Sequence, residues 1–388
     1  MYQGLPLSVA HETQEHRAWR ETVRRFVDKE LLPNIDAWDE AEEFPRALYG
    51  RIAELGLLGM GFPEKYGGTP GDLFHLMIAV EELARTASGG LLASLFSHTI
   101  GAPPIVIGGS PELKARVLPQ ILSGKKISAL AVTEPGGGSD VANLALRAER
   151  DGDHYVLNGS KTFITSGMRA DYITVAARTG GPGASGVSAL LVEGDMVGLA
   201  GLTRTPLKKM GWWCSDTAQL HFDNCRVPVT NLLGQENGGF FLFMSNFNRE
   251  RLSLAWQAYA FSRVCLDEAA EWASTRTTFG KRLVGHQVVR HKLVAMATRV
   301  EATRALIEDM TLRIERGESP VAQICMLKNF AAQTMQFCAD SAVQILGGMG
   351  YMRGTKSERI YREVKVNMIG GGAEEVLTEL AARQLGWA

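Results

Sequence analysis

The spacing of apolar residues changes twice along this chain, and this change limits the possible folds more than any other feature. From about residue 8 to 126, apolar side chains recur every three or four positions, which is typical of amphipathic helices. From 127 to 236 the period becomes two, and Gly, Asn, Asp and Pro separate the apolar runs, which predicts a small β-domain. The helical period returns over 237–272, 285–316 and 320–346, lengths that suit a helix bundle. The 388 residues suffice for two or three such packed units, and the pattern predicts an α+β protein.

Individual elements can be placed within these parts. In the first part we predict helices over Leu73–Thr86 and over Pro111–Ser123, the second capped by Ser110. In the middle part we predict strands over His154–Leu157, Tyr172–Val175 and Ala189–Val192.

Composition excludes several classes of protein. The formal net charge of -1 provides no long-range field for nucleic acid or an anionic membrane surface. The chain has no run of about 18 apolar residues, so we predict no membrane span. The histidines lack the spacing of metal ligands. The five cysteines form an odd set without a C-x-x-C pair, which favours a reduced, cytoplasmic compartment over a disulfide framework.

A Gly-rich segment over Ala131–Asp140 is the strongest candidate for a binding site. An apolar strand runs into a turn that carries the Thr133 and Ser139 hydroxyls and exposed backbone N–H groups. Such a turn can hold a flavin edge and a diphosphate without a P-loop. The alternative is an ordinary Gly-rich hairpin turn.

Three further segments carry candidate binding residues. In Asn158–Gly167 the Asn-Gly pair predicts a tight hairpin turn followed by an alternating strand, with an ordinary strand burying Phe163 as the alternative. Arg276–Leu283, followed by Gln287, offers an arginine suited to phosphate, or simply a surface arginine. Gln344–Tyr351 is the third of these candidate segments, and its alternative is a cluster of glycines at a helix C-terminus.

These four segments, in this order over the whole chain, resemble the acyl-CoA dehydrogenases. The resemblance implies an N-terminal helical domain over 1–126, a middle β-barrel-like domain over 127–236 and a C-terminal four-helix bundle over 237–388. It also implies non-covalently bound FAD and a homotetramer built as a dimer of dimers, in which the third and fourth segments reach the flavin nucleotide of a neighbouring subunit. The flavin contacts that it implies are Val132, Thr133, Gly138, Ser139, Phe163, Ile164, Thr165, Arg276, Phe279, Gln287, Gln344, Gly347, Gly348 and Glu375.

The C-terminal segment Arg362–Glu375 resembles the family signature R-D-x-K-x-x-x-I-Y-E-G-T, whose Glu is the catalytic base in most members. Nine residues after Arg362 this chain has Gly371. The backbone N–H at that position is one of the family's donors to the thioester oxygen, so Gly371 could still stabilise an enolate.

Glu250 is the best candidate for the missing carboxylate. Its segment, Phe247–Leu252, resembles that of the isovaleryl-CoA and long-chain acyl-CoA dehydrogenases, which place their base on this helix and lack the later Glu. The alternative is that Glu250 is a solvated acid between two arginines. Glu374 and Glu375 are weaker rivals, because either would need a shift of register.

The resemblance thus implies α,β-desaturation of a branched or long-chain acyl-CoA, with α-proton removal by Glu250, β-hydride transfer to flavin N5, and electrons passing to an electron-transfer flavoprotein. The substrate contacts that it implies are Ser139, Phe247, Asn248, Arg251 and Gly370. Two alternatives remain open: a relative with other chemistry, such as a desulfinating lyase or flavin oxidase, and a non-catalytic acyl-CoA-binding homologue.

Overall fold

The computed structural model describes residues 12–194 and 199–387, so the first residues of the predicted helical part, 8–11, lie outside the described chain. The N-terminal part is helical, and both predicted helices are present. The Ser110 hydroxyl accepts a hydrogen bond from Leu113 N at 3.2 Å, as expected of an N-cap. The helices are α1 (Gln14–Phe26, continued by a π-helical turn Val27–Leu31), α2 (Ile35–Ala41), α3 (Ala47–Glu54), α4 (Leu73–Ala84), α5 (Gly89–Leu95), α6 (His98–Gly101), α7 (Pro103–Gly108) and α8 (Pro111–Leu122).

The middle part is one mixed sheet of eight strands. Its hydrogen-bonded order is β6-β7-β3-β2-β4-β5-β8, and β1 pairs in parallel with β4 off this path. The three predicted strands lie within β3, β4 and β5, which extend beyond the predicted ranges. The strands are β1 (Ser128–Ala131), β2 (Arg147–Asp151), β3 (His154–Thr165), β4 (Tyr172–Arg178), β5 (Val187–Glu193), β6 (Leu202–Pro206), β7 (Thr217–Pro228) and β8 (Leu232–Leu233).

The predicted hairpin turn at Asn158-Gly159 is wrong, because both residues lie inside β3. The strand continues through them, since Leu157 pairs with Cys225 and Gly159 with Phe222 of β7. The extra residue of a β-bulge lies on β7 here, and Asn158 Oδ1 accepts the backbone N–H of Asn224 at 2.8 Å. Pairing along β3 and β7 therefore overrides the local turn preference of the dipeptide.

Gly159 lies next to this bulge in a tight position, and we expect Gly159→Ala to destabilise the protein by about 1–3 kcal/mol. Its φ is +139°, and an added Cβ would lie 2.9 Å from the backbone Cα of Leu146. Gly152→Ala is the matched control, because Gly152 also has a positive φ (+62°) but open space around it. The midpoint of urea unfolding should fall further for Gly159→Ala than for Gly152→Ala. Equal midpoints would show that contact of the added Cβ with Leu146 is not what destabilises the variant.

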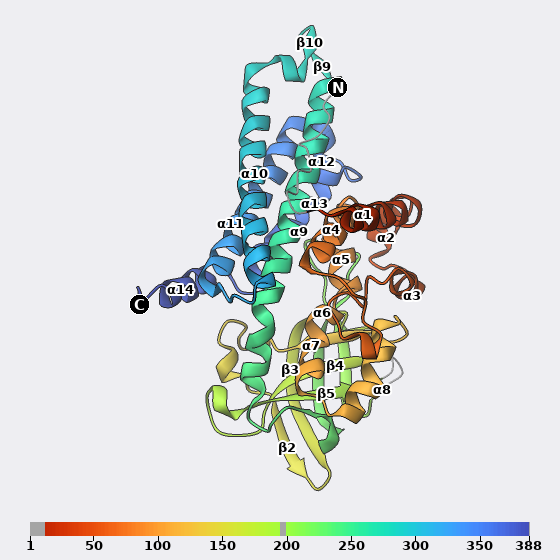
Figure 1. Ribbon diagram of the computed structural model, residues 1–388, viewed down its shortest axis with the longest axis vertical. Coiled ribbons are helices and arrows are strands. Elements are labelled where there is room, and N and C mark those ends of the chain that lie inside the picture. The colour runs from red at the N-terminus through yellow and green to blue at the C-terminus, as the bar shows by residue number, and fades with distance from the viewer. Residues whose placement is uncertain (1–11, 195–198, 388) are drawn as a thin grey trace.

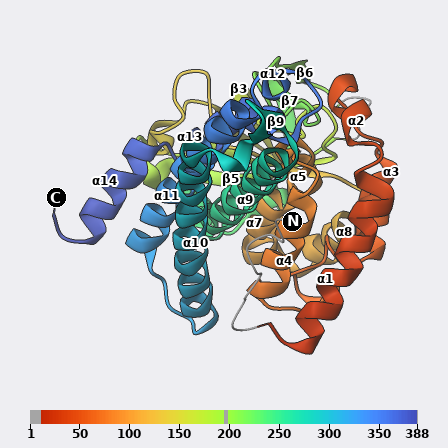
Figure 2. The ribbon, with the colours of Figure 1, turned by 90° about the horizontal axis from the view of Figure 1, so that it is seen from above.

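The C-terminal part is a helix bundle in which α9 packs against α11 and α10, and α11 also packs against α13. Figure 1 shows α9 running from the sheet to the β9–β10 hairpin at the far tip, and Figure 2 shows α14 standing apart from α1–α3 across the bundle. The elements are α9 (Gly239–Thr275), β9 (Thr277–Thr278), β10 (Lys281–Arg282), α10 (Gln287–Glu315), α11 (Val321–Leu346), α12 (Gly348–Tyr351), α13 (Lys356–Ile369) and α14 (Glu374–Gln384).

These three parts confirm the α+β fold class. We propose domain boundaries at 126/127 and 236/237, since the last helix before the sheet is α8 and the first after it is α9. Within the described residues no single helix has the length and apolarity of a membrane span. One bent pair of helices, Gly89–Leu95 with His98–Gly108, has that length and apolarity when the two are taken together.

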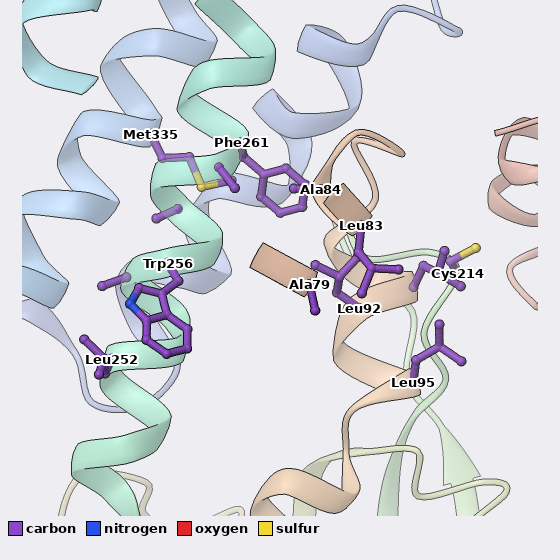
Figure 3. Close-up of a cluster of buried hydrophobic side chains, with 14 of the residues drawn as sticks. Ala79, Leu83, Ala84, Leu92, Leu95, Cys214, Leu252, Trp256, Phe261 and Met335 are labelled. Carbon is purple, nitrogen blue, oxygen red and sulfur yellow. The ribbon is translucent and has the colours of Figure 1, made fainter. Parts of the chain in front are cut away.

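The middle of α9 is fixed by the hydrophobic core. Figure 3 shows Leu252 and Trp256 of α9 in one buried cluster with Leu83 of α4 and Leu92 of α5. Leu252 and Trp256 are 1% and 3% exposed, and burial of a large apolar side chain contributes about 1.5–3 kcal/mol. The core therefore immobilises the helix turns beside Glu250.

Candidate functional site

The Gly-rich turn after β1 and the end of β3 lie side by side. Thr162 N donates to Thr133 O at 2.9 Å, which joins the first two predicted binding segments. Phe163 lies on a second irregularity of the β3–β7 pairing, with a positive φ of 60°, and its side chain is 69% exposed while that of Ile164 is buried. The alternative of a buried Phe163 is therefore wrong, and the ring presents its surface to solvent.

This surface fits a flavin. The hydroxyls of Thr133, Ser139 and Thr165 make no hydrogen bond to any part of the chain that the structure describes. Around the ideal Cβ positions of Gly136 and Gly137 no atom lies within 4 Å, so the turn leaves open space. An exposed ring, free hydroxyls and an open Gly-rich turn are the groups that a planar, hydrogen-bonding cofactor such as FAD requires.

A buried ion pair supports this surface from below. The Lys161 side chain is fully buried, and its Nζ donates to Val132 O at 2.9 Å and to Glu134 Oε1 at 2.8 Å. Burial lowers the pKa of Lys161 to about 8, and the charge of Glu134 opposes this. Glu134 Oε1 and Oε2 also accept the backbone N–H groups of Leu146 and Ala145 at 2.9 and 2.6 Å. Against the effect of its own burial, Lys161 and these donors hold the pKa of Glu134 below its usual value.

The other predicted nucleotide contacts do not join this surface within one chain. Arg276 caps α9 just before β9, Phe279 lies in the turn between β9 and β10 at the tip of the bundle, and the Phe279 ring is 97% exposed. Gln287 begins α10 beside them. Gln344, Gly347 and Gly348 lie exposed at the C-terminal end of α11.

Glu375 lies apart from all of these. It is exposed in the first turn of α14, near Asn329 in the first third of α11. Fifteen residues separate Asn329 from Gln344, which is about 22 Å of helix. Together with Glu374 and Thr378, Glu375 and Asn329 line a surface pocket of about 440 Å³ between α11 and α14.

Glu250 and Gly371 do come together. An ideal Cβ on Gly371 would lie 4.0 Å from Glu250 Oε1 and 2.6 Å from Leu254 Cδ1. The carboxylate on α9 thus lies within van der Waals contact of the place where a side chain at position 371 would begin. Gly371 has a φ of +67°, and its N–H donates to no group among the described residues.

Arg251 ties the predicted substrate contacts to this loop. Its Nε donates to Gly371 O at 3.2 Å, and its Nη1 donates to Asn248 Oδ1 at 3.1 Å. The guanidinium also lies over the Phe247 ring, 5.7 Å from the centroid. Gly370 ends α13 next to this cluster, with its N–H donating to Val366 O at 2.7 Å. Ser139, the remaining predicted substrate contact, lies in the Gly-rich turn, and among the described residues no hydrogen bond joins it to this cluster.

Glu250 is not a freely solvated acid. Its side chain is half-buried, and burial raises its pKa to about 7, against the opposing charges of Arg251 and Lys328. Such a pKa lies near the working pH, where a general base is most effective. The rival Glu375 is exposed.

Three residues of this site were missed by the sequence reasoning, namely Glu134, Lys161 and Lys328. Glu134 and Lys161 stand inside the quoted binding segments, so the segments themselves were a signal. Lys328 is 1% exposed on α11, in an apolar stripe with Ile324, Ala331 and Met335. A lysine within such a stripe is an anomaly that could have found it.

One group of potential metal ligands also escaped the spacing argument. Among the described residues, His16, Asp72 and His75 converge, with His16 Nε2 3.1 Å and His75 Nδ1 2.8 Å from Asp72 Oδ1. Thr13 N donates to His16 Nδ1 at 3.1 Å, which places the ring proton on Nε2, facing Asp72. Both histidines belong to capping boxes, so these contacts cap α1 and α4 and link them without a metal.

Comparison with known proteins places the chain in a family. Models of the acyl-CoA dehydrogenase N-terminal, middle and C-terminal domains match residues 13–125, 129–225 and 237–386. The long-chain specific mitochondrial acyl-CoA dehydrogenase of Sus scrofa is 36% identical over 376 residues, covering 96% of this chain and 87% of that protein.

Solved structures agree. The acyl-CoA dehydrogenase from Geobacillus kaustophilus is 35% identical with a TM-score of 0.93, covering 97% of this chain and 99% of that one. A glutaryl-CoA dehydrogenase from Mycobacterium smegmatis in complex with FADH2 is 27% identical with a TM-score of 0.91, covering 98% and 96%. The chain therefore belongs to the acyl-CoA dehydrogenase family of FAD-dependent oxidoreductases.

Proposed function

We propose that this protein desaturates a branched or long-chain acyl-CoA at the α,β position, with Glu250 as the base. The observation that carries the proposal is the Glu250 carboxylate oxygen, 4.0 Å from where a Gly371 side chain would begin. The chain lacks the usual family carboxylate and supplies another beside the same place. The raised pKa of Glu250, about 7, supports the role, because about half of the molecules would carry the ionised base at pH 7.

In this mechanism Glu250 accepts the α-proton of the thioester. The unpartnered Gly371 N–H donates to the thioester oxygen, where negative charge develops. Arg251, through its bond to Gly371 O, holds the following peptide unit and so restrains the loop at Gly371. Bound FAD supplies the two-electron acceptor for the β-hydrogen.

The substrate class rests on two supports. The relocated carboxylate resembles the isovaleryl-CoA and long-chain enzymes, and the Sus scrofa relative is named long-chain specific. Gly370 stands where many relatives have a tyrosine, which removes bulk near the reacting carbons. A bulky or long acyl chain fits that enlarged space.

We further propose a homotetramer, a dimer of dimers, with an electron-transfer flavoprotein as the acceptor. The separation of Phe279 and Gln344 from the Gly-rich turn supports the oligomer, because one chain alone cannot bring these flavin contacts together. The Phe279 ring is 97% exposed, so it is accessible to a neighbouring chain. Five free, buried cysteines support a reducing, cytoplasmic location.

An anaerobic titration of the FAD-loaded protein with acyl-CoAs tests the proposal. Straight short, straight long, isovaleryl and citronellyl thioesters are compared by the loss of the visible absorbance of the oxidised flavin. We expect branched or long thioesters to bleach the flavin, and short straight ones to bleach it at least about tenfold more slowly, since a poorly filled pocket loses 1–3 kcal/mol.

Other outcomes point elsewhere. Bleaching by the short straight thioester alone would contradict the substrate class while leaving dehydrogenation intact. A shift of the flavin spectrum without bleaching by any thioester would contradict dehydrogenation, and would favour other chemistry or binding without turnover.

A further inference from the structure

The buried face of α11, which is described in full, carries one charged side chain, Lys328. It is 1% exposed, yet it is not paired with a carboxylate within salt-bridge distance among the described residues. Burying an ammonium group is costly unless its donors are satisfied, so the fold must use Lys328 in another way.

Lys328 satisfies its donors on the loop that contains Gly371. Its Nζ donates to Met368 O at 3.2 Å and to Gly372 O at 2.9 Å, which lie on either side of Gly371. Arg251 takes the carbonyl between them, Gly371 O. Two cations from different helices therefore hold one carbonyl of the last turn of α13 and two of the loop after it, while the Gly371 N–H stays unpaired within the described chain.

The charge of Lys328 also acts on the carboxylate opposite. Burial raises the pKa of Glu250 to about 7, and the charges of Arg251 and Lys328 oppose that rise. Burial lowers the pKa of Lys328 itself to about 8, so it remains mostly protonated at neutral pH. The other groups that face Lys328 are Glu374 from α14 and Cys325 from α11.

We propose that Lys328 is a positioning residue for the dehydrogenation proposed above, on which this inference rests: its ammonium group fixes the loop around Gly371 beside the Glu250 carboxylate. Lys328 does not itself touch the reacting carbons. Its effect is exerted through the loop carbonyls and through its charge.

The test measures flavin reduction by rapid anaerobic mixing with the best acyl-CoA of the panel, as a function of pH. In Lys328→Gln the amide can still donate to the loop carbonyls, but the charge is lost. We expect the apparent pKa of the reduction rate to rise by about one pH unit. The rate at pH 7 should then fall roughly fivefold and recover above about pH 8.5, with the KM changed less than about twofold.

Asn329→Ala is the matched control, because Asn329 is the next residue of α11 and its Nδ2 donates to Glu374 O of the same segment at 2.9 Å without carrying charge. It should leave the apparent pKa unchanged. Lys328→Met serves the same test if the glutamine variant does not fold, and it should shift the pKa in the same direction.

Three results would overturn the inference. Superimposable pH profiles of wild type and Lys328→Gln would show that the charge has no effect on the base. An equal pKa shift in Asn329→Ala would show a general loosening of the segment. Absence of flavin reduction in wild type at every pH would remove the proposed function and this inference together, which distinguishes it from the first two results.

Discussion

Replacing Glu250 with glutamine is expected to slow flavin reduction by acyl-CoA about 100- to 10,000-fold, the range that a general base contributes. Glutamine keeps the shape of the side chain, but it cannot accept the α-proton. Because the N–H of Gly371 and the contacts of Arg251 remain, thioester binding should change little. The rate is measured by anaerobic rapid mixing, and binding by the flavin spectral shift.

The stability of this variant separates lost chemistry from a damaged fold. A carboxylate whose pKa is raised in the folded state, here to about 7, binds its proton more tightly folded than unfolded. Ionisation of this carboxylate therefore lowers the stability of the folded state progressively as the pH rises from the pKa of the unfolded state toward 7. Removing that charge should leave the thermal midpoint of Glu250→Gln at pH 8 equal to or above that of wild type.

Glu374→Gln is the matched control for the rival base. Glu374 is a half-buried acid that follows the same loop, and its charge acts on Lys328. We expect this variant to retain flavin reduction within about tenfold of wild type. A loss in Glu374→Gln as large as that in Glu250→Gln, or substantial activity in Glu250→Gln, would move the base away from α9.

Long periodic segments were predictable from the sequence, because a helix or strand of regular pattern needs only local information. The stretches 237–272, 285–316 and 320–346 correspond to α9, α10 and α11 within a few residues. The Asn158-Gly159 turn was not predictable in this way. Its dipeptide favours a hairpin, but pairing with β7, some 66 residues away, decides its conformation.

The candidate site shows the same division. The exchange of a carboxylate at 371 for one at 250 could be read from the sequence, and the structure places the two positions beside each other. Their catalytic roles stay predictions. The position of Lys328 in an apolar stripe marked it as unusual, but its role was not predictable, because its partners are backbone carbonyls, which every residue carries.

The largest stability effect is expected at the buried Lys161–Glu134 pair below the Gly-rich turn. Replacing Lys161 with methionine should lower the free energy of unfolding by about 3–5 kcal/mol, because it leaves the Glu134 carboxylate buried without its cation. It also removes the hydrogen bond to Val132 O, so we expect weaker FAD retention. Urea unfolding and the flavin-to-protein absorbance ratio measure the two effects.

Two further variants identify the cause. Lys161→Met combined with Glu134→Gln should recover part of the loss, because no unpaired charge then remains buried. Lys208→Met is the control, since Lys208 pairs with Glu42 at 2.7 Å but is 84% exposed, and an exposed pair contributes about 1 kcal/mol or less. If the double variant is no more stable than Lys161→Met, the loss comes from the missing bonds to the turn and not from the stranded charge. Lys161 would then stabilise the fold through its hydrogen bond to Val132 O, and its charge would contribute little.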